Sequence, residues 1–369
     1  MSQASLHTPL CDLLGIRVPI ALAGMATGPG TPELVAAVTR AGGLGVFGAS
    51  GMTCAALERD IARVRELVPD GPFGVNAQLA PPTPATGERA RILEVMRPFR
   101  RELGLPDEPP EPAKPDPPAA LIECALALGA AVITTFDDPA SVAEATRAAG
   151  ARLVAMVTTA DEARRALASG AEAVIAQGSE AGGHRGTYGG GEARGGGVVA
   201  LVPQVVDAVG PGVPVLASGG IMDGRGIAAA FALGAQGVSL GTCFLGSAES
   251  GAPDVYAATL HATPADQTVV TDLVTGRPAR WIRNRFLDAL LEADAGTLGW
   301  GRQAALVGDL RRAAAEQGRG DILPMLAGEG AAMSGEREPA AEIVARLVRE
   351  TAAALTGLAA LSEPDEPGV

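Results

Sequence analysis

Between residues 18 and 245 the chain alternates short apolar runs with longer Ala-rich segments that carry charged residues. This alternation is typical of β-α units, in which each strand is followed by a helix that covers the sheet. The sequence predicts eight strands, at residues 18–24, 44–50, 73–79, 131–136, 152–158, 173–178, 214–220 and 237–245. It predicts helices between most of them, including 32–41 with Thr31 as N-cap, 138–149, 161–169 and 223–233.

The predicted strands are apolar along most of their length, which indicates a parallel sheet that is covered on both faces. Eight such strands in about 230 residues fit a (β/α)8 barrel, the TIM barrel, within its usual size range. A doubly wound open sheet stays as the alternative, because the number of strands does not prove that the sheet closes. The predicted fold class is therefore α/β, a (β/α)8 TIM barrel with an appended, mostly helical C-terminal region.

Two stretches depart from the repeat. Residues 80–118 hold clusters of Pro, Glu and Arg, and we expect a mostly solvated excursion after the third strand, with a charged helix at 87–103. In residues 181–197 nine of seventeen residues are Gly, so this segment is either a flexible linker or part of the active face that the loops after barrel strands build. The predicted domains are the barrel at 1–250, excursion included, and a helical region at 251–369 that packs on it.

The overall charge and the cysteines limit the classes of function. A formal net charge of −13 opposes binding to phosphate backbones and to anionic membranes, so nucleic-acid and membrane functions are poor candidates. Polar residues break up the N-terminus where a secretory signal would be apolar, and we expect a soluble, cytoplasmic protein. The four cysteines lie far apart without a neighbouring histidine, which argues against a metal site and a disulfide framework.

Glycines at the ends of the last two predicted strands form a candidate phosphate site. Glycine lets backbone N–H groups approach an anion closely, and TIM barrels often bind phosphate at the loops after strands seven and eight. The helix predicted at 223–233 would add the partial positive charge of its N-terminus. Tight turns would explain one Gly-Gly pair, but two such loops at neighbouring strand ends favour a phosphorylated ligand. This phosphate cradle comprises Gly219, Gly220, Ser239, Leu240, Gly241 and Thr242.

His184 is the candidate catalytic residue. It lies in the glycine-rich segment after the sixth predicted strand, where we expect its imidazole to be accessible to a ligand on the active face. A histidine in such a place can abstract a carbon-bound proton near neutral pH. The other histidines, His7 near the N-terminus and His261 in an Ala/Leu-rich helical stretch, are interpreted as surface or packing residues.

Five segments of the chain carry a family resemblance. They begin at Val18 (VPIALAGMATGPGTPELVAAVTRAGGLGVFGA), Phe73 (FGVNAQL), Ala176 (AQGSEAGGHRG), Ala217 (ASGGIMDGRGIAAAFALGAQGVSLGT) and Thr275 (TGRPARWIRNRF). Together, in this order, they closely resemble the bacterial nitronate monooxygenases, formerly called 2-nitropropane dioxygenases. The resemblance covers nearly the whole chain. It implies an FMN-binding (β/α)8 barrel with an added helical region.

The resemblance also implies roles for the residues that match the family. The backbone around Ala23, Gly24 and Met25 would flank the isoalloxazine ring of FMN. Asn76 and Gln177 would bond the flavin or its ribityl chain. These roles come from the family and not from the spacing of the residues.

Gly182 and Gly183, together with the phosphate cradle, would hold the ribityl-phosphate end, and His184 matches the family histidine for substrate binding or proton abstraction. The implied reaction is the FMN-dependent oxidation of an alkyl nitronate, or a similar carbon acid, by O2 to a carbonyl product and nitrite. His184 would be the base or the residue that holds the anion. The implied partners are a small-molecule substrate, O2 and a second copy in a homodimer; no metal is expected.

Three alternatives stay open. A flavin-dependent enoyl-thioester reductase shares the barrel and the EAGGH segment but takes electrons from NAD(P)H. A nitronate-monooxygenase-like oxygenase recruited to a biosynthetic pathway would oxidise or rearrange a different acidic carbon compound with O2. A non-enzymatic flavin-binding or interaction protein is the alternative from another class, and an accessible His184 argues against it.

The chain departs from the family pattern at two places. From Thr134 to Asp137 it reads TTFD where relatives commonly have a Ser/Phe/Gly pattern, so we expect the substrate-side wall to differ. Glu329 stands where relatives typically have Gln. We expect its carboxylate to lie near the pocket and to repel an anionic nitronate.

Overall fold

A closed parallel barrel forms the centre of the computed structural model, which describes residues 6–79, 82–111, 114–189 and 195–361. Its strands follow the order β1-β9-β8-β6-β5-β4-β3-β2, and a parallel bridge between Ala21 and Leu44 joins the two ends. The predicted TIM barrel is therefore confirmed, and the open sheet is wrong. The strands are β1 Ile20–Leu22, β2 Gly45–Gly48, β3 Phe73–Gln78, β4 Val132–Phe136, β5 Arg152–Val157, β6 Ala173–Gln177, β8 Val215–Ser218 and β9 Gly237–Leu240.

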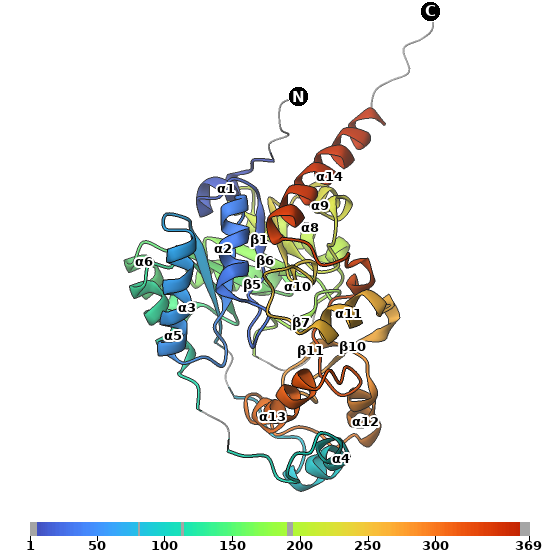
Figure 1. Ribbon diagram of the computed structural model, residues 1–369. Helices are drawn as coiled ribbons and strands as arrows, with labels where there is room; N and C mark the ends of the chain where they lie inside the picture. Colours follow the sequence, from blue (N-terminus) through green and yellow to red (C-terminus); the bar gives the residue numbers. More distant parts are fainter. Residues whose placement is uncertain (1–5, 80–81, 112–113, 190–194, 362–369) are drawn as a thin grey trace, which may run out of the picture.

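Helices surround the barrel and extend beyond one end of it (Figure 1). The predicted N-cap is confirmed, because the Thr31 hydroxyl accepts a hydrogen bond from Leu34 N at 3.0 Å. No helix in the described ranges has the length and hydropathy of a membrane-spanning segment. The helices are α1 Pro9–Leu14, α2 Pro32–Ala41, α3 Cys54–Leu67, α4 Arg89–Glu102, α5 Pro118–Ala127, α6 Ala140–Ala148, α7 Ala160–Ala168, α8 Val198–Val209, α9 Gly224–Ala232, α10 Thr242–Leu245, α11 Asp254–Ala262, α12 Arg285–Ala293, α13 Arg302–Glu316 and α14 Ala340–Ala360.

Side chains of α1 and of the strands fill the amino-terminal half of the barrel. Leu10 of α1 packs with inward-facing strand residues such as Val46, Val132 and Leu216, and each of these four residues is at most 2% exposed. Because α1 closes this end, the space that remains inside the barrel opens toward the carboxyl ends of the strands. Loops that carry chemistry in such barrels lie at that end.

A second hydrophobic core lies beyond the carboxyl ends of the strands and contains α4 (Figure 1). Ile92 and Met96 are fully buried, and the rings of Phe99 and Phe286 on α12 meet edge to face at 5.2 Å. The buried Arg100 forms a two-pronged ion pair with Asp309 at 2.8 Å. The expectation that the excursion is mostly solvated is therefore wrong for its helix. The many charges of α4 lie beside an apolar stripe with helical spacing.

A small antiparallel sheet joins this second core to the barrel. It consists of β7 Gly183–His184, β10 Thr268–Thr271 and β11 Ala279–Ile282, in the order β10-β11-β7. The sequence did not predict this sheet, because its strands have two to four residues and β7 contains glycine.

The last helix, α14, returns to the barrel and packs against α2 and α9 (Figure 1). Its Ile343 and Leu347 are buried in the barrel core. The appended helical region is thus present, but its last element belongs to the packing of the barrel wall. The domain boundary at residue 250 stays a prediction.

The burial of α4 can be tested by shortening one side chain. Ile92→Ala removes atoms from a side chain that is 0% exposed and is expected to lower the free energy of unfolding by about 2–5 kcal/mol. Glu94→Ala, on the exposed side of the same helix, is the matched control, with an expected change below about 0.5 kcal/mol. Urea denaturation measures both changes. Equal unfolding midpoints for the two variants would show that α4 is not part of the core.

Candidate active site

A cavity of about 1130 Å³ lies at the carboxyl ends of the strands. Its wall combines strand ends of the barrel with α11, α13 and residues 323–330 of the appended region. The structure brings together at this one cavity every residue that the sequence analysis assigned to flavin or substrate. They are Ala23, Gly24, Met25, Asn76, Gln177, Gly182, Gly183, His184, Gly219, Gly220, Ser239, Leu240, Gly241 and Thr242.

The segment after β1 lies close to the neighbouring strands. A Cβ atom on Gly24 would lie 2.4 Å from the Cβ of Asn76 on β3, so only glycine lets the segment after β1 approach Asn76 this closely. Ala23 N donates to Leu240 O at 2.8 Å, which connects this segment to the phosphate cradle. The backbone at residues 23–25 thereby forms one fixed wall of the cavity.

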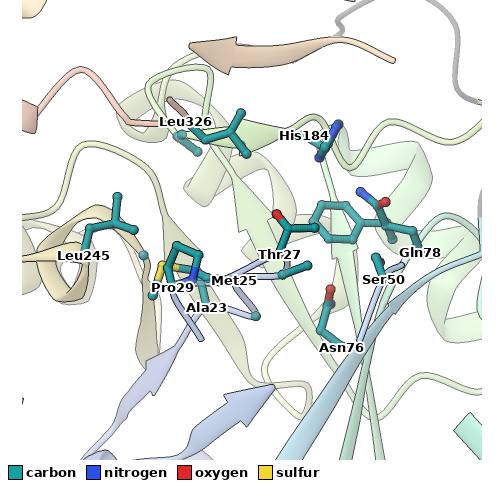
Figure 2. A pocket seen from close by; sticks show the side chains of 18 of the residues that line it. Ala23, Met25, Thr27, Pro29, Ser50, Asn76, Gln78, His184, Leu245 and Leu326 are labelled. Carbon is teal, nitrogen blue, oxygen red and sulfur yellow. The ribbon is translucent and has the colours of Figure 1, made fainter. Parts of the chain in front are cut away.

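Asn76 and Gln177 both line the cavity, but they differ in which hydrogen-bonding groups remain available to a ligand. Asn76 is buried, and its Nδ2 donates to Thr134 Oγ1 at 2.8 Å, while Figure 2 shows its side-chain oxygen directed toward the cavity. Gln177 Nε2 donates to His184 O at 2.8 Å, and its Oε1 accepts from Gly186 N at 2.8 Å. Gln177 therefore fixes the histidine segment, and only its second Nε2 hydrogen is left for a ligand.

The phosphate cradle presents backbone donors at one end of the cavity. Gly219 and Gly220 have φ values of +124° and +67°, which favour glycine and turn successive N–H groups toward one side. Within the described part of the chain, the N–H groups of Gly219, Gly220 and Gly241 form no hydrogen bond. Gly219 and Gly241 are partly buried and Gly220 is exposed, so their unbonded N–H groups are accessible to a ligand and the cradle fits an anion.

The N-terminus of α9 does not contribute to this cradle, which corrects the expectation for the helix predicted at 223–233. Asp223 caps the helix by accepting from the N–H groups of Arg225 and Gly226 at 3.0 and 3.3 Å. The Glu350 carboxylate of α14 accepts from Gly224 N at 3.0 Å. The N–H groups that would meet a phosphate are already bonded to carboxylates, because Asp is itself a favourable N-cap.

His184 is held on β7 against aromatic rings of the appended region. Its Nε2 lies 2.9 Å from Thr275 Oγ1. The rings of Trp300 and Trp281 meet the imidazole edge to face, with centroids 5.0 and 6.3 Å away. In Figure 2 the ring lies on the side of the pocket opposite Asn76.

The surroundings of His184 keep its imidazole neutral. Burial, the largest cause, acts together with the nearby cations Arg277 and Arg311 to lower the pKa of His184 from 6.5 to about 3. At neutral pH the ring therefore has one N–H donor and one nitrogen lone pair. The ring lines the cavity, where a ligand can reach it.

The sequence analysis missed the side chains around His184, namely Thr275, Trp281, Trp300 and Arg311. Trp281 and Trp300 are the two tryptophans of the chain, in a sequence with only 3% aromatic residues. That scarcity was the signal that could have found them. Arg311 lines the cavity from α13, where its Nη1 donates to Thr27 Oγ1 at 2.6 Å.

The interpretation of the other two histidines is confirmed, because both lie at the surface. His7 bonds Asp12, and His261 bonds the carbonyl of Ser334. Neither residue lines the cavity. His184 is thus the one histidine of the chain that can act in this site.

The two departures from the family pattern have different outcomes. Thr134 and Phe136 line the cavity, and the expectation that the substrate-side wall differs from that of relatives stays a prediction. The expected repulsion by Glu329 is wrong: its carboxylate pairs with Arg280 at 2.9 Å and borders a separate small cavity behind the phosphate cradle. The ion pair compensates its charge, and the residue does not line the main cavity.

Comparisons with known proteins agree with this geometry. The model of the family described as nitronate monooxygenase matches residues 7–350. A probable nitronate monooxygenase of Staphylococcus saprophyticus is 37% identical over 88% of this chain and 92% of its own length. Among the similar solved structures is the nitroalkane oxidase from Streptomyces ansochromogenes, with a TM-score of 0.83 and 35% identity over 95% of this chain and 99% of its own chain. Another is FabK from Thermotoga maritima, with a TM-score of 0.77 and 31% identity over 97% of this chain and 100% of its own chain. The chain therefore belongs to the nitronate monooxygenase family of flavin-dependent oxidoreductases.

Proposed function

We propose that this protein uses FMN to oxidise alkyl nitronates, or similar carbon acids, with O2 to a carbonyl compound and nitrite. In the balanced net reaction, two nitronate anions and one O2 give two carbonyl compounds and two nitrite anions. The observation that carries the proposal is one cavity that has unbonded backbone donors at one end and a neutral histidine in its wall. The first feature suits a phosphorylated cofactor, and the second suits a carbon acid.

The residues at the cavity fit FMN. The N–H groups of Gly219, Gly220 and Gly241 would hold the phosphate, and the Asn76 oxygen and the second Gln177 hydrogen would bond the polar edge of the flavin. The backbone of residues 23–25 offers a flat wall without long polar side chains. When bound, FMN supplies the electron transfer between the carbon acid and O2.

The hydrogen bonds around His184 define its tautomer. The Thr275 hydroxyl lies 3.3 Å from Arg277 O, to which it donates, so it accepts the Nε2 proton of His184. This leaves the Nδ1 lone pair to take a carbon-bound proton from a neutral nitroalkane. Formation of the nitronate anion beside the ring raises the pKa of His184, because the charge on the imidazolium is then compensated.

The appended region excludes water from the reaction. Trp281 and Trp300 cover the imidazole, and apolar side chains such as Leu245 and Leu326 line the same cavity. A dry cavity strengthens the hydrogen bonds to a charged substrate. Arg311 adds a positive charge to the wall, and no carboxylate pairs with it in the described ranges.

A second candidate function is that of a flavin-dependent enoyl-thioester reductase that uses NAD(P)H. The observation that favours it is the similarity to FabK, which covers 97% of this chain. An oxygenase of a biosynthetic pathway that acts on another acidic carbon compound would use the same cavity. The source of the electrons separates the reductase from both oxygenases.

The cofactor assignment predicts that the phosphate contributes to binding. The apoprotein is expected to bind FMN at least about 100-fold more tightly than riboflavin, because only FMN occupies the cradle. Gly220→Ala, at a φ of +67°, is expected to reduce this preference. Gly212→Ala, where a Cβ meets no atom within 4 Å, is the control. Fluorescence titration measures the affinities, and equal affinities for the two flavins would contradict the assignment.

The reaction assignment predicts turnover with nitronate alone. The purified, yellow protein is expected to consume O2 with ethyl nitronate and to release about two nitrite ions for each O2, as the net reaction requires. It is not expected to oxidise NADPH with a crotonyl thioester. An oxygen electrode and a nitrite assay measure the first reaction, and absorbance at 340 nm the second. Reduction of the flavin by NADPH without nitronate turnover would favour the reductase.

The role of His184 predicts a loss of turnover without loss of flavin. His184→Ala is expected to lower kcat/KM for a nitroalkane at least about 100-fold, because proton transfer by a positioned base is lost. Since the pKa of His184 is about 3, the wild-type profile is expected to show no acidic limb from this residue above about pH 5. His261→Ala, at the surface, is the control. Unchanged turnover of the His184 variant would remove this residue from the mechanism.

A further inference from the structure

Two sequence features that the proposed function does not use meet in the structure. Asp137 is the last residue of the TTFD segment, one of the two places where the chain departs from the family pattern, and Arg277 belongs to the TGRPARW segment. Arg277 Nη1 lies 2.7 Å from Asp137 Oδ2, and the two side chains are only 1% and 7% exposed. The pair joins the end of β4 to the residues before β11, which are 140 positions apart in the chain. A buried pair of this kind leaves a costly charge behind when one partner is lost.

The guanidinium of Arg277 also holds the segment that follows His184. Its Nε and Nη2 donate to Arg185 O at 3.2 and 3.1 Å, and Nη2 donates to Thr187 O at 2.9 Å. The other oxygen of Asp137 accepts from Gly189 N at 2.9 Å. Asp137 has a φ of +66°, which a residue with a short polar side chain tolerates. The pair therefore fixes the residues from 185 to 189.

The same arginine fixes the ring of His184 through its backbone. The Thr275 hydroxyl that bonds His184 Nε2 is 3.3 Å from Arg277 O. On the other side, Arg185 N donates to Pro278 O at 2.8 Å, next to the β7–β11 pairing of His184 with Ala279. The backbone and the guanidinium of Arg277 thus act on both the ring and the main chain of the histidine.

The charge of the pair matters as well as its geometry. The cations that act on His184 are Arg277 and Arg311. In the described ranges Asp137 is the one carboxylate that pairs with Arg277, and no carboxylate pairs with Arg311. Thr275 and the two tryptophans around the ring are uncharged. The other charged residues that line the cavity are Asp116, Arg312 and Glu316. Asp137 is therefore the carboxylate that compensates the Arg277 charge.

We propose that the Asp137–Arg277 pair is the positioning element of His184, which orients its ring and reduces the effect of the arginine charge on it. Asp137 and Arg277 are positioning residues, because neither lines the cavity. The inference rests on the role of His184 in the proposed function. Its test includes a signal of the histidine ring that does not need turnover.

The test compares single and double charge removals. The variants are Asp137→Asn, Arg277→Gln and the double variant, each with similar side-chain size. Asp138→Asn is the matched control, because this neighbouring aspartate pairs with Arg165 at the surface. The readouts are flavin content, kcat and KM for ethyl nitronate, and ¹⁵N NMR of histidine-labelled protein from pH 4 to 8. The chain has three histidines, so His184→Ala assigns the signal.

The two single variants are expected to act in opposite directions on the ring. Arg277→Gln removes a cation and leaves the Asp137 carboxylate unpaired, so the pKa of His184 is expected to rise above about 4.5 and into the measured range. Asp137→Asn leaves the guanidinium unpaired, so the ring stays neutral throughout, while kcat falls at least about tenfold with the flavin bound. The double variant is expected to return the His184 titration to the wild-type pattern. Asp138→Asn changes none of these readouts.

Three results would overturn the inference. One is an unchanged His184 titration in Arg277→Gln, and another is a shift in the same direction in both single variants, as a general loosening of the fold would produce. The third is wild-type kcat in Asp137→Asn. If Arg277→Gln does not fold, Arg277→Lys is the substitute, because it keeps the positive charge but cannot form all the hydrogen bonds of the guanidinium group. This variant is expected to lower kcat while the His184 ring stays neutral. If the pKa of His184 rises in Arg277→Gln and the ring stays neutral in Asp137→Asn, but the protein does not oxidise nitronates, the proposed function is contradicted and the role of the pair at His184 is retained.

Discussion

The pairing of β7 with β11 is the contact on which the site depends. It comprises two residue pairs, His184 with Ala279 and Gly183 with Arg280. Through it Gly183 and His184, which belong to a glycine-rich segment with little conformational preference of its own, take up a fixed position. The barrel supplies the strand that leads into this segment, and the appended region supplies the strand that receives it. Neither part alone would define the position of the imidazole.

The proposed anion site has no lysine among its described lining residues, in a protein whose net charge is −13. Long-range charge sets how ligands approach, whereas the contacts inside a buried cavity act over a few ångströms. At one end these contacts are backbone N–H groups that glycine leaves uncovered. Elsewhere in the wall Arg311 is partly buried and has no carboxylate partner in the described ranges. The acidic surface and an anionic ligand are therefore compatible.

Periodicity predicted the strands of the barrel, because parallel strands buried on both faces are apolar along most of their length and stand out from the helices between them. The same reasoning failed for α4, where Arg and Glu side chains on one face masked the buried Ile92 and Met96 on the other. It could not find β7, since two residues carry no periodic signal. The contacts of His184 with Thr275 and Trp300 join residues about a hundred positions apart, and only the folded chain brings them together.

The placement of helices at the phosphate cradle shows a further limit of the sequence. The pattern correctly located α9, but which acceptor its N–H groups meet depends on Asp223 and on Glu350 from the far end of the chain. A motif can give the direction of a helix and still leave open whether a ligand or a carboxylate caps it. The glycines, whose φ values exclude most other residues, were the more dependable guide.

The position of α14 has a consequence for how the protein is made. Its Ile343 and Leu347 cover barrel helices that include α2, an element formed from the first part of the chain. During synthesis, the side of α2 that packs against α14 stays uncovered until some 300 further residues have left the ribosome. The nascent barrel thus carries an uncovered seam for most of its translation, at roughly 5–20 residues per second. Chaperones that hold apolar surface have their longest opportunity at this seam.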